Sequence, residues 1–323
     1  MLSVFVPETG SLRKIDPEGH ALSPQAVWID LKSPTVAEEK MVEDLIGIEV
    51  PTREDMQEIE ISSRLYIENG ARYMTASLIS GTDTTEPRVT PVSFILAAHR
   101  IVTVRYDDPK AFPLVEAKLA RGCPSNLSGD MVLLDLLESV VDRSADILER
   151  VGADVDSVSA QIFETSAERG HARSYSQILR TIGRKGDLTS KVRESLVSIG
   201  RLISFTAVEN EAGRWSKEHR AQLKTLQRDV QSLSDHASYL SSKITFVLDA
   251  MLGVVNLEQN NIIKLFSVMA VVLMPPTLIA SVYGMNFKFM PELEFPYAYP
   301  MVLGLMLCAA IGPYLFFKWK KWL

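Results

Sequence analysis

Hydrophobic positions along the first 120 or so residues come in short runs separated by turn residues. Apolar residues at helical spacing predict a helix over 36–46, and a Thr52-x-x-Asp55 capping box opens a second helix over 52–59. Asn69-Gly70 between two apolar runs indicates a hairpin. Strands are predicted over 3–6, 26–31, 64–68, 72–80, 89–98 and 101–105. We therefore expect a mixed or antiparallel sheet flanked by helices.

From residue 127 the pattern changes to long helices. Two helices are predicted over 131–163 and 172–208, with breaks at 168–170 and 209–213. After Trp215 no clear break follows for about 65 residues, and apolar residues recur at alternating steps of three and four. This heptad seam consists of Leu223, Leu226, Val230, Leu233, Ala237, Leu240, Ile244, Val247, Met251 and Val254. A helix of that length would extend for about 100 Å.

Two apolar runs close the chain, over 262–282 and 297–317. Each has 21 residues, with Lys264 as the one charge in the first run and none in the second. About 20 such residues cross a bilayer. Basic residues at 318, 320 and 321 follow, and basic flanks favour the cytoplasmic side. We predict two membrane spans, an outer loop over 283–296, a basic tail over 318–323 and both termini in the cytoplasm.

Charge is unevenly distributed. The net charge is −6, and residues 1–260 hold 29 basic and 38 acidic side chains once the last 63 residues are set aside. This acidic excess argues against nucleic acid as a partner. It is compatible with cations as ligands, and equally with a domain that only needs to stay soluble. The two cysteines, Cys123 and Cys308, predict no disulfide, since Cys308 lies in the second apolar run.

The first span has a candidate ion path along one side. Two helices per chain cannot enclose a polar path, so a conduit requires an oligomer. Small and polar residues recur on that side together with Ile263 and Met274: Asn260, Ser267, Ala270, Thr277, Ser281 and Gly284. Close helix packing in lipid would also explain small residues there. Pro275-Pro276 leaves the carbonyls of Val271 and Val272 without their usual donors, which suits either an ion path or a packing kink.

The residues after this span are specific. Tyr283-Gly284-Met285-Asn286, then Met290-Pro291-Glu292-Leu293 and a closing Lys321-Trp322-Leu323, resemble the CorA family of divalent-cation channels. Asn256-x-Glu258-Gln259-Asn260 before the membrane also matches. With the patterns above, the expected fold is an α+β cytoplasmic domain (1–126), coiled-coil-like long helices (127–260) and a two-span α-helical membrane hairpin (261–323). The resemblance implies a funnel-shaped homopentamer in the cell inner membrane, with the first span lining the pore.

The resemblance also assigns roles. It implies Mg²⁺ as main substrate, with Co²⁺ and Ni²⁺ also carried. Gly284, Met285 and Asn286 would form the outer selectivity ring, and Asn286 would face the hydrated Mg²⁺. Pore positions would be Asn260, Ile263, Phe266, Met274 and Thr277, with Ile263, Phe266 and Met274 as an apolar constriction. Asp249 matches the position of a regulatory Mg²⁺ site.

Chemistry suggests a further role outside the membrane and leaves rival functions open. Glu292 and Glu294 in the outer loop would concentrate cations by their field. No nucleophile–base pattern supports an enzyme. One alternative is a membrane-anchored coiled-coil sensor or scaffold without transport. Another is a Zn²⁺ transporter of a related branch, although that branch typically has Val where this chain has Met285.

Overall fold

The structure is a computed structural model of the whole chain. It describes every residue except 9, 16–21, 83, 85, 166–171, 210–214, 287, 289, 321 and 323, so the predicted break at 168–170 and most of that at 209–213 lie outside the described residues. The chain divides into two compact units, Met1–Leu248 and Asp249–Leu323. The three-part division expected from the sequence stays a prediction.

A seven-stranded sheet forms the centre of the first unit. Its strands are β1 (Leu2–Glu8), β2 (Ser11–Ile15), β3 (Trp28–Lys32), β4 (Leu65–Glu68), β5 (Ala71–Ser80), β6 (Arg88–Ala97) and β7 (Arg100–Arg105). They lie in the order β2-β1-β3-β7-β6-β5-β4. β3 and β7 run parallel, and the other neighbouring pairs are antiparallel. The predicted mixed sheet is confirmed, whereas β2 was not predicted.

One face of the sheet packs against short helices. These are α1 (Val36–Ile46) and α2 (Arg53–Gln57), followed by α3 (Ile61–Arg64). Thr35 and Thr52 cap α1 and α2 in capping boxes with Glu38 and Asp55, which confirms the predicted capping box. The apolar core on this side contains Val4, Ile29, Leu31, Val42, Met56, Tyr73, Ile95, Val102 and Val104.

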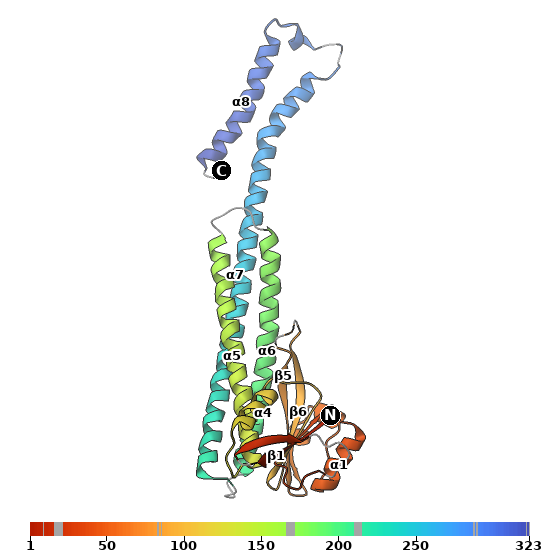
Figure 1. Cartoon of the computed structure of the whole chain (residues 1–323). Coiled ribbons are helices and arrows are strands. Elements are labelled where there is room, and N and C mark those ends of the chain that lie inside the picture. Colours follow the sequence, from red (N-terminus) through yellow and green to blue (C-terminus); the bar gives the residue numbers. More distant parts are fainter. Residues whose placement is uncertain are drawn as a thin grey trace. The chain divides into compact units, whose positions relative to one another are not determined.

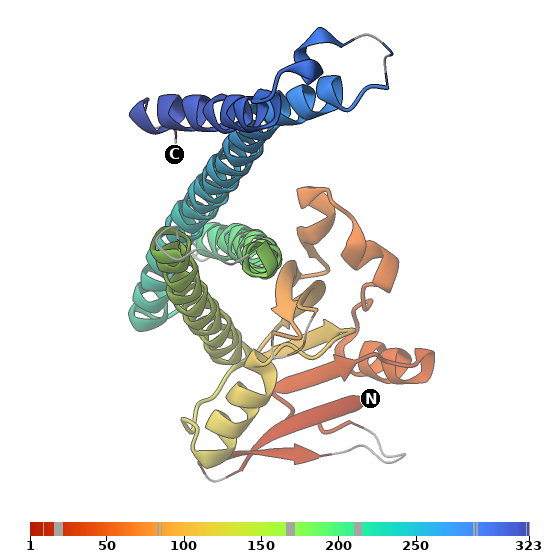
Figure 2. The ribbon, with the colours of Figure 1, turned by 90° about the horizontal axis from the view of Figure 1, so that it is seen from above.

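Long helices cover the other face. α4 (Ala111–Arg121) precedes α5 (Gly129–Thr165) and α6 (Ala172–Glu209), and α6 lies beside β5 (Figure 2). The hydroxyl of Ser198 accepts a hydrogen bond from the backbone N–H of Ser77 at 2.9 Å, and the hydroxyl of Thr206 lies 3.3 Å from the sulfur of Met74. Because both faces are covered, every residue of β5 is buried.

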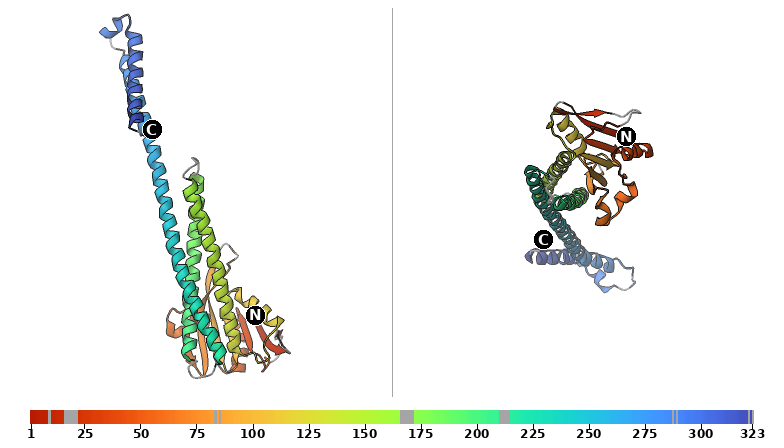
Figure 3. Two further views of the ribbon diagram at one scale, coloured as in Figure 1. Left: turned by 90° about the vertical axis from the view of Figure 1, so that its left-hand side faces the viewer. Right: turned by 90° about the horizontal axis from the view of Figure 1, so that it is seen from below.

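The predicted heptad seam belongs to α7 (Lys217–Tyr283), and its part within the first unit, from Leu223 to Val247, packs within the same chain (Figures 1 and 3). Leu240 lies beside Gly152 of α5, whereas Val230 and Ile244 lie beside glycines of α6. The ion pairs Lys185–Asp154 and Lys243–Asp156 add contacts between these helices. The heptad pattern therefore arises from a three-helix arrangement in which α7 buries its apolar seam on α5 and α6.

The second unit contains the end of α7, the 3₁₀ helix η2 (Pro291–Glu294) and α8 (Ala298–Trp319). α7 and α8 are both long and apolar enough to cross a membrane. Only 6% and 0% of their most apolar 18-residue windows are buried within the chain. Such exposure of apolar side chains is costly in water, so lipid or other protein is the natural environment of both segments.

Candidate ion-conduction site

The predicted pore residues lie on one side of α7. At 3.6 residues per turn, positions 260, 263, 266, 274 and 277 fall within one third of the helix circumference. The side chains of Ile263, Phe266 and Met274 are 62%, 62% and 67% exposed, and Asn260 and Thr277 are exposed as well. Three large apolar side chains and two polar ones are therefore presented on a single face.

Asp249 lies on α7 between two seam residues and is turned away from them. Val247 and Met251 are buried at 1% and 4% exposure, whereas Asp249 is exposed. Two positions along a helix differ by about 200°, so a residue between two buried ones points to the opposite side. The carboxylate of Asp249 is thus accessible from outside the chain.

Two consecutive prolines stand inside α7, at 275 and 276. Proline has no N–H, so the carbonyls of Val271 and Val272 lose the donor four residues ahead. Just beyond, the hydroxyl of Thr277 donates to the carbonyls of Leu273 and Met274, at 2.9 and 2.8 Å. Backbone acceptors without N–H donors are tolerated in a membrane only beside protein, water or an ion. This part of α7 therefore offers oxygen acceptors near the helix face that carries Met274.

α7 ends at the Gly-Met-Asn tripeptide. The N–H of Gly284 still bonds to the carbonyl of Ala280 at 2.9 Å, and Met285 bonds to Val282 at 3.3 Å. A Cβ at position 284 would lie 3.1 Å from the Ala280 carbonyl oxygen, so glycine allows this tight helix end. Met285 and Asn286 follow outside the helix and are exposed. Asn286 thus lies exposed directly beyond the end of α7.

The acidic pair predicted to attract cations lies in the same connection. Glu292 and Glu294 belong to η2, and both side chains are exposed. Residues 287 and 289, on the way from Asn286 to η2, lie outside the described residues. The two carboxylates follow Asn286 by six and eight residues in the chain.

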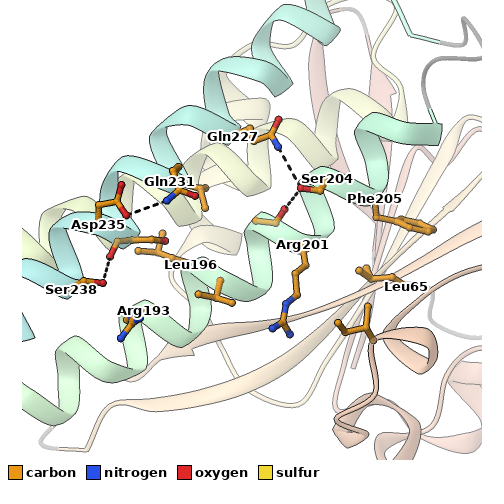
Figure 4. Close-up of a pocket in the computed structure, with 15 residues that line it drawn as sticks. Leu65, Arg193, Leu196, Arg201, Ser204, Phe205, Gln227, Gln231, Asp235 and Ser238 are labelled. Carbon is orange, nitrogen blue, oxygen red and sulfur yellow. Dashed lines mark hydrogen bonds between the residues drawn. The ribbon is translucent and has the colours of Figure 1, made fainter.

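The predicted site residues do not line the cavity drawn in Figure 4. That cavity has a volume of about 660 Å³ and lies in the first unit between α6, α7 and residues 61 and 65 (Figure 4). Its walls carry Arg193 and Arg201, and Gln231 donates to Asp235 at 3.1 Å across one turn of α7. Within the described residues, no group of three or more His, Cys, Asp or Glu side chains is placed to hold a metal ion. In this single chain the candidate site is a helix face and not a cavity.

Comparison with known proteins identifies the family. The sequence profile of the family described as "CorA-like Mg2+ transporter protein" matches residues 23–320. The chain belongs to this family. Relatives in the CorA family include the magnesium transport protein CorA of Mannheimia succiniciproducens, 32% identical over 323 residues, and that of Escherichia coli K12, 33% identical over 324 residues. Each alignment covers 100% of both chains. The predicted family is confirmed, and it is a family of transporters, not enzymes.

Solved structures share the fold of this CorA family member. The complete CorA magnesium transporter of Methanocaldococcus jannaschii aligns with a TM-score of 0.78 at 17% identity, covering 100% of this chain and 99% of that one. Full-length CmaX aligns with a TM-score of 0.63 at 13% identity, covering 100% and 98%. The cytoplasmic domain of ZntB from Vibrio parahaemolyticus aligns with 78% of this chain and 96% of its own length, at 9% identity and a TM-score of 0.59. At these identities the likeness extends to the fold alone.

Proposed function

We propose that this chain is a subunit of a Mg²⁺ channel that admits the ion down the membrane potential and also carries Co²⁺ and Ni²⁺. The observation that carries the proposal is full-length membership of the CorA family together with a helix that ends in Gly284-Met285-Asn286. The residues on one face of α7 would line the path, and both chain termini would lie in the cytoplasm at the inner membrane.

Selection would occur at Asn286. Mg²⁺ binds oxygen and gives up its water reluctantly. A ring of carboxamide oxygens from several copies would accept hydrogen bonds from the hydration shell without holding the ion as tightly as a ring of carboxylates. Gly284 would let backbone carbonyls approach the same position and add neutral acceptors. Met285 would complete the ring.

The driving force would come from charge and potential. A membrane potential of about 100 mV contributes about 2.3 kcal/mol for each elementary charge, so a divalent ion gains about 4.6 kcal/mol on entry. That corresponds to a ratio of roughly 2,000 at equilibrium. The exposed carboxylates of Glu292 and Glu294 would raise the local cation concentration at the outer mouth.

A closed path would require several copies, and we propose a homopentamer. Two helices per chain cannot enclose a polar path, whereas a ring of α7 helices would place Ile263, Phe266 and Met274 around one axis as an apolar constriction. Asn260 and Thr277 would provide polar rings on either side. α7 also exposes Tyr239 and Phe246, at 57% and 61%, on the part that precedes the membrane segment. Exposed aromatic side chains of this kind suit contacts with other copies.

Control would reside at Asp249. Its exposed carboxylate would bind Mg²⁺ between neighbouring subunits when the internal concentration is high and hold the assembly closed. Loss of the ion would leave like charges facing one another. The helices would then move apart, and the constriction near Met274 would widen and fill with water.

Proteoliposomes test the proposal. The full chain is reconstituted, a K⁺ diffusion potential is imposed, and a Mg²⁺-sensitive dye inside reports entry in the absence of any nucleotide. We expect uptake that rises with the negative internal potential and that external Co²⁺ and Ni²⁺ reduce by competition. Absence of uptake at every potential would contradict transport and favour a membrane-anchored sensor or scaffold.

Zn²⁺ transport is the second candidate function. It is suggested by the likeness in fold between 78% of this chain and the ZntB cytoplasmic domain, although fold alone does not determine the substrate. Met285 in the middle of the tripeptide favours Mg²⁺ over this alternative. In the same liposomes, entry of Zn²⁺ is followed with a Zn²⁺-sensitive dye and entry of Mg²⁺ with the Mg²⁺-sensitive dye. If the alternative were correct, Zn²⁺ would enter faster than Mg²⁺.

A further inference from the structure

A second cavity lies in the first unit, at the end of the sheet where three turns meet. Its volume is about 590 Å³. Its walls come from Gly47 at the end of α1, from the β4–β5 turn at Asn69-Gly70 and from Ala98 in the β6–β7 turn. Three charged side chains complete the lining: Arg72, Arg100 and Asp130. The cavity is separate from α7 and from every residue assigned to ion conduction.

Arg72 brings a positive charge into the interior. It lies on β5, and its side chain is 8% exposed. Among the described residues its guanidinium donates one hydrogen bond, from Nη2 to Oδ1 of Asp130 at 3.4 Å. Guanidinium has five N–H donors and stays charged at all ordinary pH values. Most of the hydrogen-bonding capacity of Arg72 is therefore unused in the described part of the chain.

Arg100 adds a second guanidinium from the first residue of β7. Its Nη2 donates to the backbone carbonyl of Pro24. Its Nε is fully buried and has no hydrogen-bond acceptor within the described residues. Because water cannot reach that atom, Arg100 contributes its positive charge to the cavity and not this N–H.

The backbone holds these groups in place. α5 begins at Gly129, whose N–H donates to the carbonyl of His99 at 2.8 Å. A Cβ at position 129 would lie only 2.4 Å from the carbonyl carbon of Arg100. The close approach that glycine allows brings Asp130 to Arg72 and fixes the start of α5 beside the start of β7.

We infer that this cavity binds a small anion that carries a phosphate group. The charged residues of the lining sum to one net positive charge, because two arginines face one aspartate. Guanidinium groups bind phosphate oxygens through paired, charge-assisted hydrogen bonds, which would use the open donors of Arg72 beside the positive charge of Arg100. The volume lies within the range of about 300–1,000 Å³ usual for small-molecule sites, and leaves room for an organic group beyond the phosphate.

Calorimetry on the full-length protein in detergent tests this inference. Inorganic phosphate, glycerol phosphate and sodium chloride are titrated separately at matched ionic strength, in buffer containing a chelator so that Mg²⁺ does not bind the phosphate. We expect saturable binding of phosphate and none of chloride. Tighter binding of glycerol phosphate identifies a phosphate monoester as the ligand class, whereas binding of phosphate alone identifies the free ion.

Variants locate the binding. Arg100→Gln removes one guanidinium and should weaken phosphate binding at least about tenfold. Asp130→Asn removes the competing carboxylate and should tighten it several-fold, and this variant keeps the test decisive if Arg100→Gln fails to fold. Arg193→Gln, an exposed arginine of the cavity in Figure 4, is the matched control and should change nothing. Equal heats for phosphate and chloride would show that no phosphate binds, and an unchanged phosphate affinity in Asp130→Asn would show that phosphate binds outside this cavity. Either result would overturn the inference.

Discussion

Asp30 and Arg105 bring opposite charges together inside the sheet. Their side chains are 7% and 8% exposed, and Arg105 donates from Nε and Nη2 to the two carboxylate oxygens at 2.9 to 3.1 Å. Thr103 also donates to Asp30 at 2.7 Å and accepts from the indole N–H of Trp28 at 3.0 Å. Burial alone would lower the pKa of Arg105, but the hydrogen bonds and charges of Asp30 and Asp108 together outweigh burial and raise that pKa. The guanidinium of Arg105 therefore keeps its charge inside the sheet.

Removing one residue of the Asp30–Arg105 pair should lower the free energy of unfolding by much more than the intact pair contributes to it. Asp30→Ala would leave the guanidinium of Arg105 buried without its main acceptor, and we expect the free energy of unfolding to fall by about 3–5 kcal/mol. Denaturant unfolding of the full chain in detergent, followed by circular dichroism, measures the change.

An exposed ion pair on the neighbouring strands is the control for that prediction. Arg13 and Glu8 lie 3.2 Å apart with side chains 65% and 54% exposed, so Glu8→Ala should change stability by less than about 1 kcal/mol. Similar losses of unfolding free energy in Asp30→Ala and Glu8→Ala would contradict the view that burial determines how much an ion pair matters for stability.

At the scale of elements, the sequence predicted most of the sheet and the helices but not every short piece. α1 has the bounds predicted from its spacing, and Asn69-Gly70 forms the expected hairpin turn. β2 was missed because only Leu12 of its five residues is buried, so no alternation marks it. α4 was missed because it contains Pro113, and proline in a sequence usually indicates the end of a helix. Pro113 lies in the first turn of α4, where a helix tolerates proline.

Only part of the candidate site could be predicted from the sequence. The spacing of Asn260, Ile263 and Thr277 predicts a shared helix face, because that depends only on the period of α7. The same spacing does not say what the face meets, since that depends on other copies of the chain. Arg72 and Arg100 were missed for a different reason. Each stands on a strand, and only the fold brings them together with Asp130 around one cavity.

Gly129 connects two elements, and its substitution tests their packing. Helix propensity alone would make Gly129→Ala stabilising by up to about 1 kcal/mol. Here the added Cβ would meet backbone atoms of Arg100 and Ile101 at 2.4 and 2.5 Å, which cannot yield without moving β7. We expect a net loss of about 1–3 kcal/mol in the free energy of unfolding, measured by denaturant titration.

A second glycine supplies the matched control. Gly183 lies inside α6 and its added Cβ would meet no atom within 4 Å, so Gly183→Ala should stabilise the protein by about 0.5–1 kcal/mol. The two substitutions are chemically identical and are expected to have opposite signs. A gain in both variants would refute the close packing of α5 against β7.

At the scale of the whole molecule, α7 connects the proposed sensor to the proposed filter. Asp249 and Tyr283 are 34 residues apart on this one helix, about 50 Å at 1.5 Å per residue. Control over that distance requires two arrangements of the assembled helices that bind internal Mg²⁺ with different affinity. A two-state change of this kind is the simplest way for an ion at one end to affect conduction at the other.

Asp249→Ala should uncouple the two ends. Without the carboxylate, Mg²⁺ inside the liposome would no longer favour the closed state, so inhibition by internal Mg²⁺ should require at least about tenfold more ion. Dye-reported uptake over a series of internal Mg²⁺ concentrations measures this. Asp235→Ala, on the same helix but within the first unit, serves as the control and should leave the inhibition curve in place. Identical curves for the wild type and Asp249→Ala would exclude Asp249 as the sensor.

The most direct test of the central claim is Mg²⁺ flux through wild type and Asn286→Ala side by side. Both proteins are reconstituted at equal density, their oligomeric state is checked by native mass analysis, and Mg²⁺ entry is followed under the same imposed potential. We predict that the wild type conducts, and that Asn286→Ala assembles normally but loses nearly all Mg²⁺ entry, because the oxygens that receive the hydrated ion are gone. Undiminished Mg²⁺ entry through an intact Asn286→Ala assembly would contradict selection at the Gly284-Met285-Asn286 end of α7.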